Sequence, residues 1–305
     1  MVKTDNPGGT IMKDQLVKAL VLDGRVRVYL DRTTDMVQEA RDRFDLHPTA
    51  CAALGRVLSI ASIMGSMLKS DQEMLTISIN GHGPIGSIIV DAYANGNVRG
   101  FVSNPHVEDV YKGPGKLDVG AVVGRDGTMT VTKDLHMAEN WTGTIELQSG
   151  EIGEDFAYYF TMSEQTPSAV SVGVKIGTDG NVESAGAMLL QMLPDATEED
   201  IRICEHVLAG LKPMSTLMQE YDDSSLDQLL KDMFDDAQIL ETRDIAFHCD
   251  CDRQKTEKVL MTLPKKDIED LLGQDDGITI TCNFCNDEYH FDRDDLQKIL
   301  DKMNA

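Results

Sequence analysis

The sequence predicts an α+β fold in three parts, namely a mixed α/β N-terminal domain rich in antiparallel strands, a helical linker and a small C-terminal domain. Three observations predict it. Tight-turn dipeptides separate strand-like runs in the first two thirds of the chain, the composition turns acidic after Pro194, and four of the six cysteines gather near the C-terminus. We place the three parts at residues 1–194, 195–240 and 241–305.

Four turn dipeptides predict the antiparallel sheet of the first domain. Each lies between two runs of apolar and β-branched residues, which is the sequence pattern of a β-hairpin. The expected strand pairs are 16–22 with 26–30, 88–93 with 98–102, 119–123 with 129–132, and 169–176 with 182–189. The corresponding turns are Asp23-Gly24, Asn95-Gly96, Asp126-Gly127 and Asp179-Gly180.

Helices are predicted among these strands. Thr33 and Thr34 can cap a helix that ends near Phe44, and Pro48 can open a second helix that extends to Leu68. Residues 151–162 follow with an acidic first turn and aromatic side chains at helical spacing.

Three further features of this domain suggest enzymes, but each has a structural interpretation. The G-x-G-x-x-G at residues 81–86 precedes a β-branched run instead of the helix that a dinucleotide loop requires, so we expect a turn between strands. Ser66 and Lys69 match the S-x-x-K motif of penicillin-binding enzymes, but the S-D-N and K-T-G motifs that accompany it are absent. Cys51 has no nearby His or second Cys and is expected to be a packed side chain. We therefore expect no enzyme.

The net charge of −24 argues against nucleic acid and against anionic membranes as partners, because both attract basic proteins. The first nine residues contain no apolar run of signal-peptide length, and we expect no later stretch to be long and apolar enough to span a bilayer. The expected location is the cytoplasm, where paired cysteines more often bind metal or sense redox state than form permanent disulfides.

The linker at 195–240 is predicted to be helical but marginally stable. It holds 3 basic and 12 acidic residues, a net charge of −9, so its carboxylates repel one another. Thr197 can cap one amphipathic helix, and a second is expected from Ser225 to Asp236. Both need a surface to pack on. An ordinary acidic connection between domains is the alternative for this segment.

The last part contains two close cysteine pairs. Cys249 and Cys251 form a C-x-C pair, and Cys282 and Cys285 form a C-x-x-C pair after a spacer that runs from Asp252 to Thr281. Two such pairs supply the four thiolates that Zn²⁺ binds tetrahedrally, so we predict a small zinc-binding domain that depends on the metal for folding. Four unrelated buried thiols or two structural disulfides are the alternatives.

Four thiolates leave no open position on the metal, which disfavours hydrolysis. Three roles remain for the metal site, namely a structural role, nucleic-acid binding and redox sensing. Residues 241–305 hold 9 basic and 16 acidic residues, and this negative charge disfavours binding to DNA. Metal-held sulfurs stay electron-rich. An oxidant that converts one to a sulfenic acid lets the near neighbour close a disulfide and expel the metal.

The chain resembles the redox-regulated heat-shock protein 33 family, which are bacterial holdase chaperones, over nearly its whole length. Besides the cysteine spacing, the resemblance rests on three segments: Pro48 to Arg56, the Gln165 to Val174 run QTPSAVSVGV, and Gly186 to Pro194. It implies an inactive reduced form with one zinc on the four cysteines. It also implies an oxidised form with disulfides Cys249–Cys251 and Cys282–Cys285, which releases zinc, unfolds the linker, forms a homodimer and binds unfolding client proteins.

Two other functions remain open from the residues. The zinc domain could stabilise a binding module without a redox switch, which would bind its partner when reduced and lose that binding on oxidation. The N-terminal domain could be an enzyme that uses Cys51 or Ser66. Such an activity would survive loss of the zinc ligands.

Overall fold

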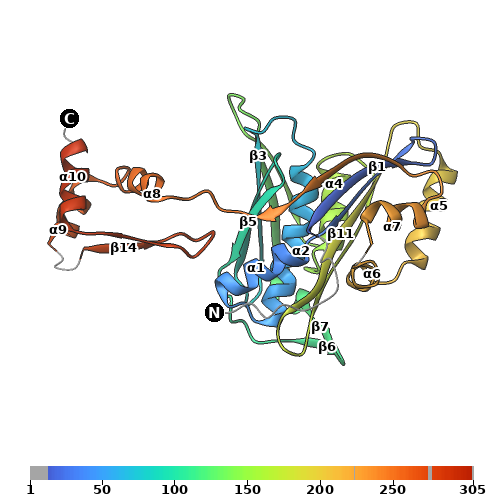
Figure 1. Cartoon of the computed structure of the whole chain (residues 1–305), viewed down its shortest axis with the longest axis horizontal. Helices are drawn as coiled ribbons and strands as arrows, with labels where there is room; N and C mark the ends of the chain where they lie inside the picture. Colours follow the sequence, from blue (N-terminus) through green and yellow to red (C-terminus); the bar gives the residue numbers. More distant parts are fainter. Residues whose placement is uncertain (1–12, 223, 274–276, 304–305) are drawn as a thin grey trace. The chain divides into compact units, whose positions relative to one another are not determined.

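The computed structural model describes residues 13–222, 224–273 and 277–303, and it divides the chain into two compact units between His248 and Cys249 (Figure 1). The predicted α+β class with antiparallel sheets is confirmed. Residues 1–9, in which we expect no signal peptide, lie outside the described part of the chain.

The first sheet of unit one has the strand order β10-β11-β2-β1-β12, and all its neighbours are antiparallel. The predicted hairpins at Asp23-Gly24 and Asp179-Gly180 are confirmed. Both glycines have φ near +80°, a backbone conformation that residues with a side chain rarely adopt. The strands are β1 (Gln15–Val21), β2 (Val26–Arg32), β10 (Ser168–Ile176), β11 (Val182–Met192) and β12 (Gln238–Asp244).

The second sheet has the order β13-β5-β4-β3-β8-β9, in which only the described pair β13 and β5 is parallel. The Asn95-Gly96 hairpin is confirmed, and the chain turns between β3 and β4 within residues 81–86 as expected. The strands are β3 (Met74–His82), β4 (Ser87–Tyr93), β5 (Asn97–Val102), β8 (Gly124–Asp134), β9 (Trp141–Glu146) and β13 (Ala246–Phe247), and a separate short hairpin joins β6 (Tyr111–Gly113) to β7 (Lys116–Leu117).

The hairpin predicted at Asp126-Gly127 is wrong. Residues 119–123 form the short helix α3 (Val119–Val123), and β8 runs without a break through both turn residues. The Asp118 carboxylate caps α3 by accepting from the Ala121 N–H at 3.0 Å, an interaction that competes with strand formation. Gly127 lies so close to the Asn80 carbonyl of β3 that a Cβ atom would overlap it.

Helix α2 (Pro48–Gly65) forms the centre of unit one and contacts strands of both sheets (Figure 1). Helices α1 (Thr34–Phe44) and α4 (Gly153–Met162) join the same core. Our expectation that no stretch is long and apolar enough to span a bilayer is wrong for α2. It meets both criteria by length and composition, yet 89% of it is buried inside the protein, as suits a core helix.

The other face of the first sheet is covered by α5 (Glu198–Gly210), α6 (Met214–Glu220) and α7 (Leu226–Met233). Alternate residues of each strand face opposite sides, so Val28 and Leu30 lie under these helices whereas Tyr29 faces the α2 core. We call the sheet residues under α5–α7 the covered sheet face. Its buried members are Val17, Ala19, Val21, Val26, Val28, Leu30, Met188 and Leu190.

Two arginines attach these helices to the sheet. Arg25 donates from Nε and Nη2 to the Asp200 carboxylate of α5, at 2.8 and 3.0 Å. Arg32, only 2% exposed, donates from Nη2 to the carbonyl oxygens of Tyr221 and Ser224 at 2.6 and 3.0 Å. The helices of the predicted linker are therefore packed on the first sheet and hydrogen-bonded to it.

The chain leaves α7 through β12 and β13 before reaching Cys249. β12 extends the first sheet by pairing with β1, and β13 pairs with β5 of the second sheet. Residues 241–248, expected in the C-terminal part, thus belong to unit one. Pairing with strands from the first third of the chain decides this, and the local sequence does not reveal it.

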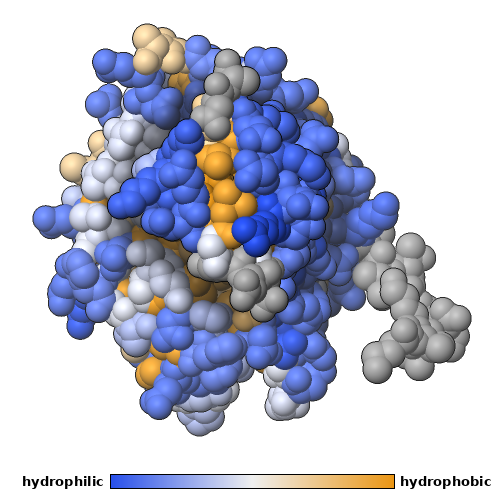
Figure 2. Space-filling model, turned by 90° about the vertical axis from the view of Figure 1, so that its left-hand side faces the viewer, coloured by the Kyte–Doolittle hydropathy of each residue, from blue (hydrophilic) through white to orange (hydrophobic). Residues whose placement is uncertain are grey.

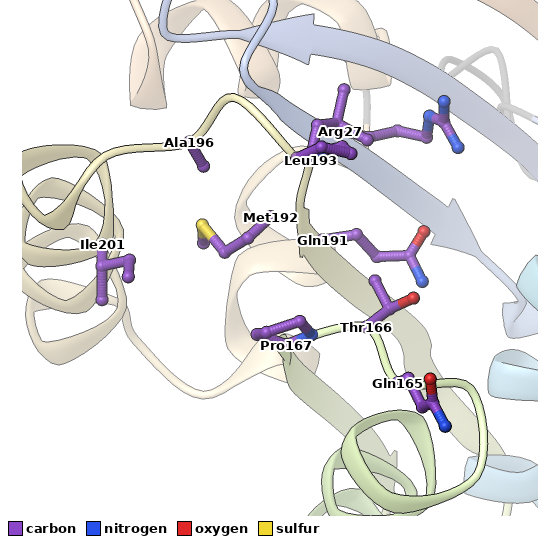
Figure 3. A pocket seen from close by; sticks show the side chains of 10 residues that line it. Arg27, Gln165, Thr166, Pro167, Gln191, Met192, Leu193, Ala196 and Ile201 are labelled. Atoms are coloured by element: carbon purple, nitrogen blue, oxygen red, sulfur yellow. The ribbon is translucent and has the colours of Figure 1, made fainter.

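A pocket of about 440 Å³ lies where β11 leads toward α5. Figure 3 shows Met192 directed toward Ile201 and Pro167, while its neighbour Gln191 points the other way, as strand alternation requires. The Met192 N–H donates to the Pro167 carbonyl at 3.1 Å, so two segments that carry the family resemblance meet here. The pocket is lined by Arg27, Gln165, Thr166, Pro167, Gln191, Met192, Leu193, Pro194, Ala196 and Ile201.

Unit two contains three helices and one hairpin among its described residues. The elements are α8 (Arg253–Leu260), α9 (Lys265–Leu272), β14 (Ile278–Thr281), β15 (Glu288–Phe291) and α10 (Arg293–Met303). Helix α10, which we did not predict, starts where the Asp292 carboxylate accepts from the Asp295 N–H at 2.8 Å. The buried apolar cluster is small: Leu260, Ile268, Phe291, Leu296, Ile299 and Leu300.

Candidate metal centre

Two tight turns present the four predicted ligands, and both belong to unit two. Cys249 and Cys251 precede α8, whose first turn is capped by Asp252 through the Lys255 N–H at 2.7 Å. Cys282 and Cys285 lie in the turn between β14 and β15. There the Cys282 N–H donates to the Asp287 carbonyl at 2.9 Å, and the Asn286 N–H donates to the Cys282 carbonyl at 2.8 Å.

The four sulfur atoms converge, and all lie within 4.8 Å of one another. The Sγ atoms of Cys249 and Cys282 are 3.9 Å apart, and those of Cys251 and Cys285 are 3.1 Å apart. Tetrahedral zinc with bonds of about 2.3 Å separates its sulfur ligands by about 3.8 Å, so the arrangement fits such an ion. The described residues therefore contain a four-thiolate cluster able to hold a metal.

The environment of Cys285 opposes ionisation of its thiol when no cation is bound. Burial and the neighbouring sulfurs Cys251 and Cys282 raise the pKa of Cys285 well above its usual range. A divalent cation reverses this preference, because ligand thiolates lose their protons to the metal. Of the four side chains, Cys285 is buried and the other three are half-buried, so solvent and small oxidants can reach the site.

One contact of the cluster was missed by the sequence reasoning. The Tyr289 hydroxyl of β15 lies 3.1 Å from the Cys251 sulfur. Tyr289 follows Cys285 closely in the sequence, but Cys251 lies on the far side of the spacer, and only the folded hairpin brings the two together. A tyrosine close after a C-x-x-C pair is the signal that could have raised this possibility.

The remaining cysteines lie in unit one and are buried as small packed side chains. Burial raises the pKa of Cys51 to about 12 and that of Cys204 to about 11, so both stay protonated and unreactive at neutral pH. The Ser66 hydroxyl donates to the Ile63 carbonyl at 2.6 Å. Neither Cys51 nor Ser66 is activated as a nucleophile.

Comparison with known proteins decides the family. The profile of the Hsp33 protein family matches residues 14–292, which include all four clustered cysteines. The chain belongs to the Hsp33 family. It is 45% identical over 294 residues to the 33 kDa chaperonin of Bacillus cytotoxicus and 46% identical to that of Bacillus cereus, in each case covering 96% of this chain and 100% of the relative.

Solved structures agree with the sequence comparison. The crystal structure of the 33 kDa chaperonin, or heat shock protein 33 homolog, from Thermotoga maritima matches this fold with a TM-score of 0.88 and 33% identity. The match covers 96% of this chain and 100% of the other. The predicted resemblance to this chaperone family is thus confirmed, and membership in Hsp33 supports a chaperone function with client proteins as partners.

Proposed function

We propose that this protein is an ATP-independent holdase chaperone, without enzymatic activity, whose binding surface is switched by oxidation of the four cysteines. The observation that carries the proposal is the convergence of Cys249, Cys251, Cys282 and Cys285 within 4.8 Å, in a unit with a small apolar core. In the reduced form these thiolates would hold one zinc ion, and the chaperone would be inactive.

Bound zinc would supply charge neutralisation and a cross-link between two turns that are separated in sequence by the whole of α8 and α9. Structural zinc sites contribute on the order of 10–16 kcal/mol of apparent folding free energy. Six buried apolar side chains are a modest core for unit two, so we expect its fold to depend on intact thiolates.

Oxidation would act on the ligands in two balanced steps. A thiolate attacks hydrogen peroxide, the O–O bond breaks, and sulfur becomes a sulfenic acid while the released hydroxide takes a proton to form water. The neighbouring thiolate then attacks this sulfur, an S–S bond forms, and the S–O bond breaks with loss of a second water. We propose the pairs Cys249–Cys251 and Cys282–Cys285, after which no thiolates remain to retain zinc.

The pairing can be tested by tryptic mass spectrometry of the oxidised chain. Lys and Arg residues lie between Cys251 and Cys282 but not inside either pair, so trypsin separates the pairs. Disulfides within the pairs leave two separate peptides, each lighter by two hydrogens. A single species that joins both peptides would instead show bonds between Cys249 or Cys251 and the second pair, and would contradict the proposed pairing.

The covered sheet face is the surface that we propose for client binding. In the reduced state α5–α7 bury it. Figure 2 shows a different side of the protein, whose visible surface is mostly hydrophilic with apolar residues in narrow strips. The chain runs from α7 through β12 and β13 directly into Cys249. Unfolding of unit two would remove the anchor at the end of this path, and the acidic linker helices 195–240 would then open and expose apolar residues to clients.

Charge and composition support the remaining features. A net charge of −24 would keep an open apolar surface soluble, and it disfavours nucleic acids and membranes as partners. Cytoplasmic reductants would maintain the inactive form. We further propose that the oxidised form is a homodimer, in which part of the newly exposed apolar surface is covered by a second chain.

One experiment tests the switch as a whole. Zinc content and suppression of aggregation of a chemically unfolded client are measured before oxidation, after peroxide with mild heat, and after re-reduction. We expect loss of one zinc per chain, a gain of suppression, and reversal of both. If zinc is released without that gain, or suppression is full while zinc is bound, a zinc-stabilised binding module without a redox switch is the better description.

A further inference from the structure

We propose that the Tyr289 hydroxyl protects the metal centre by donating a hydrogen bond to the Cys251 thiolate, and so sets how fast this sulfur reacts with oxidants. The proposal rests on the metal-binding part of the proposed function and adds a residue to it. Tyr289 is a positioning residue, because it acts through Cys251 and does not itself bind the metal.

The contact between Tyr289 and Cys251 joins the segments that carry the two cysteine pairs. Tyr289 lies on β15 opposite Ile280 of β14, in the hairpin that carries Cys282 and Cys285 at its turn. Its ring is half-buried against the apolar cluster of unit two, and its oxygen lies 3.1 Å from the Cys251 sulfur. The hydroxyl therefore links the second cysteine pair's hairpin to the first pair.

A second set of contacts holds the first pair beside β15. Arg253, which follows Cys251 closely in the sequence, donates to the His290 carbonyl and to the Asp295 carboxylate. Its guanidinium lies 4.4 Å from the centre of the Phe291 ring. These contacts place the segment of Cys251 against the strand of Tyr289, so the short distance between oxygen and sulfur has support on both sides.

The direction of the hydrogen bond follows from the chemistry of a ligand thiolate. In a free thiol either atom can donate, but a thiolate carries no proton and can only accept. The phenol is then the donor. Such a bond draws electron density from sulfur, which lowers its nucleophilicity toward an electrophilic oxygen while leaving it bound to the metal.

The reaction affected is the first oxidation step at Cys251. The sulfur lone pair attacks hydrogen peroxide, an S–O bond forms, the O–O bond breaks, and the leaving hydroxide is protonated to water. Cys249 then attacks the sulfenic sulfur, and the second oxygen leaves as water with formation of the disulfide. The lone pair that accepts from Tyr289 is partly withdrawn from the first attack, so the hydrogen bond slows this sequence.

The test is Tyr289→Phe, which removes the oxygen and keeps the packed ring. In the full-length reduced zinc protein, we expect peroxide to release zinc about three- to tenfold faster than in wild type, followed with a chromogenic zinc chelator. Tyr111→Phe, at a 56% exposed position in unit one, is the matched control and should release zinc at the wild-type rate. Equal rates for Tyr289→Phe and wild type would overturn the proposal.

A spectroscopic readout separates a bond to sulfur from a purely structural role. In the Co²⁺-substituted protein, loss of a donor to the thiolate should move the sulfur-to-cobalt charge-transfer band to lower energy. An unshifted band, or a variant that loses zinc to a chelator without oxidant as fast as with it, would assign Tyr289 to packing alone and reject the inference. If wild type binds no zinc or cobalt, the metal site itself fails, whereas normal binding with unchanged variant behaviour rejects only the role of Tyr289.

Discussion

Truncation of Leu230 in α7 tests whether the linker helices control access to the covered sheet face. Leu230 is completely buried against this face. Replacing a fully buried leucine by alanine costs about 3 kcal/mol, through lost apolar burial and the cavity that remains. At about 1.4 kcal/mol per factor of ten, the open form of the α7 region should become about 100-fold more populated in the reduced zinc-bound Leu230→Ala protein.

Two measurements follow this opening without any oxidation. Amide hydrogen exchange should accelerate in α5–α7 but not in α2 or in the second sheet, and the reduced variant should suppress client aggregation in part. Leu240→Ala is the matched control, because this leucine is 52% exposed on β12 and its truncation removes little packing. Unchanged exchange in α7 would refute the packing argument, and faster exchange with no gain in client binding would refute the covered sheet face as the binding surface.

Three further predictions concern the anchor, the pH dependence and the metal. Asp200→Asn weakens the double hydrogen bond from Arg25, so amide exchange in α5 should become severalfold faster, and an unchanged rate would show that packing alone holds this helix. Burial raises the pKa of Asp14 to about 7, so the native chain binds a proton that the unfolded chain releases near pH 4. The Asp14 contribution to stability should therefore fall by at most about 1.4 kcal/mol per unit as pH rises from 4 to 7. Burial also raises the pKa of Asp31, so urea unfolding should show a steeper fall in wild type than in Asp14→Asn, and equal slopes would contradict the prediction. Chelation of the reduced protein should abolish exchange protection in α8–α10 while emission from Trp141, the only tryptophan, stays native; surviving protection would mean that unit two folds without metal.

Local sequence was sufficient wherever a structure depends on neighbouring residues. Asp23-Gly24 and Asp179-Gly180 form the predicted hairpins because glycine tolerates the positive φ that these turns require. The helix that ends at Phe44 was expected because Thr33 or Thr34 could cap its start, and it forms although the Thr33 side chain makes no capping hydrogen bond. Asp126-Gly127 misled the same reasoning, because the dipeptide lies inside β8, at a register shift in the pairing of β8 with β3, and not at the end of a hairpin.

The candidate site likewise has some features that local sequence predicts and others that only the tertiary structure shows. The spacing of the four cysteines predicted a ligand set whose sulfurs the fold does bring together. The contact of Arg25 with Asp200 joins residues that are distant in the sequence, and no local pattern marks it. Tyr289 stands close after the C-x-x-C pair, but nothing local indicates that its partner is Cys251. The β12 pairing that carries residues 241–244 into the first sheet is equally non-local.

The sequence by itself therefore determined the class of the fold, three of the four predicted turns, most helices and the identity of the clustered cysteines, since each follows from short-range backbone preference or residue chemistry. The tertiary structure alone decided which sheet face α5–α7 cover, where the second unit begins, and which hydroxyl contacts Cys251. These depend on strand order and register, and register is set by apolar residues packing across the whole chain.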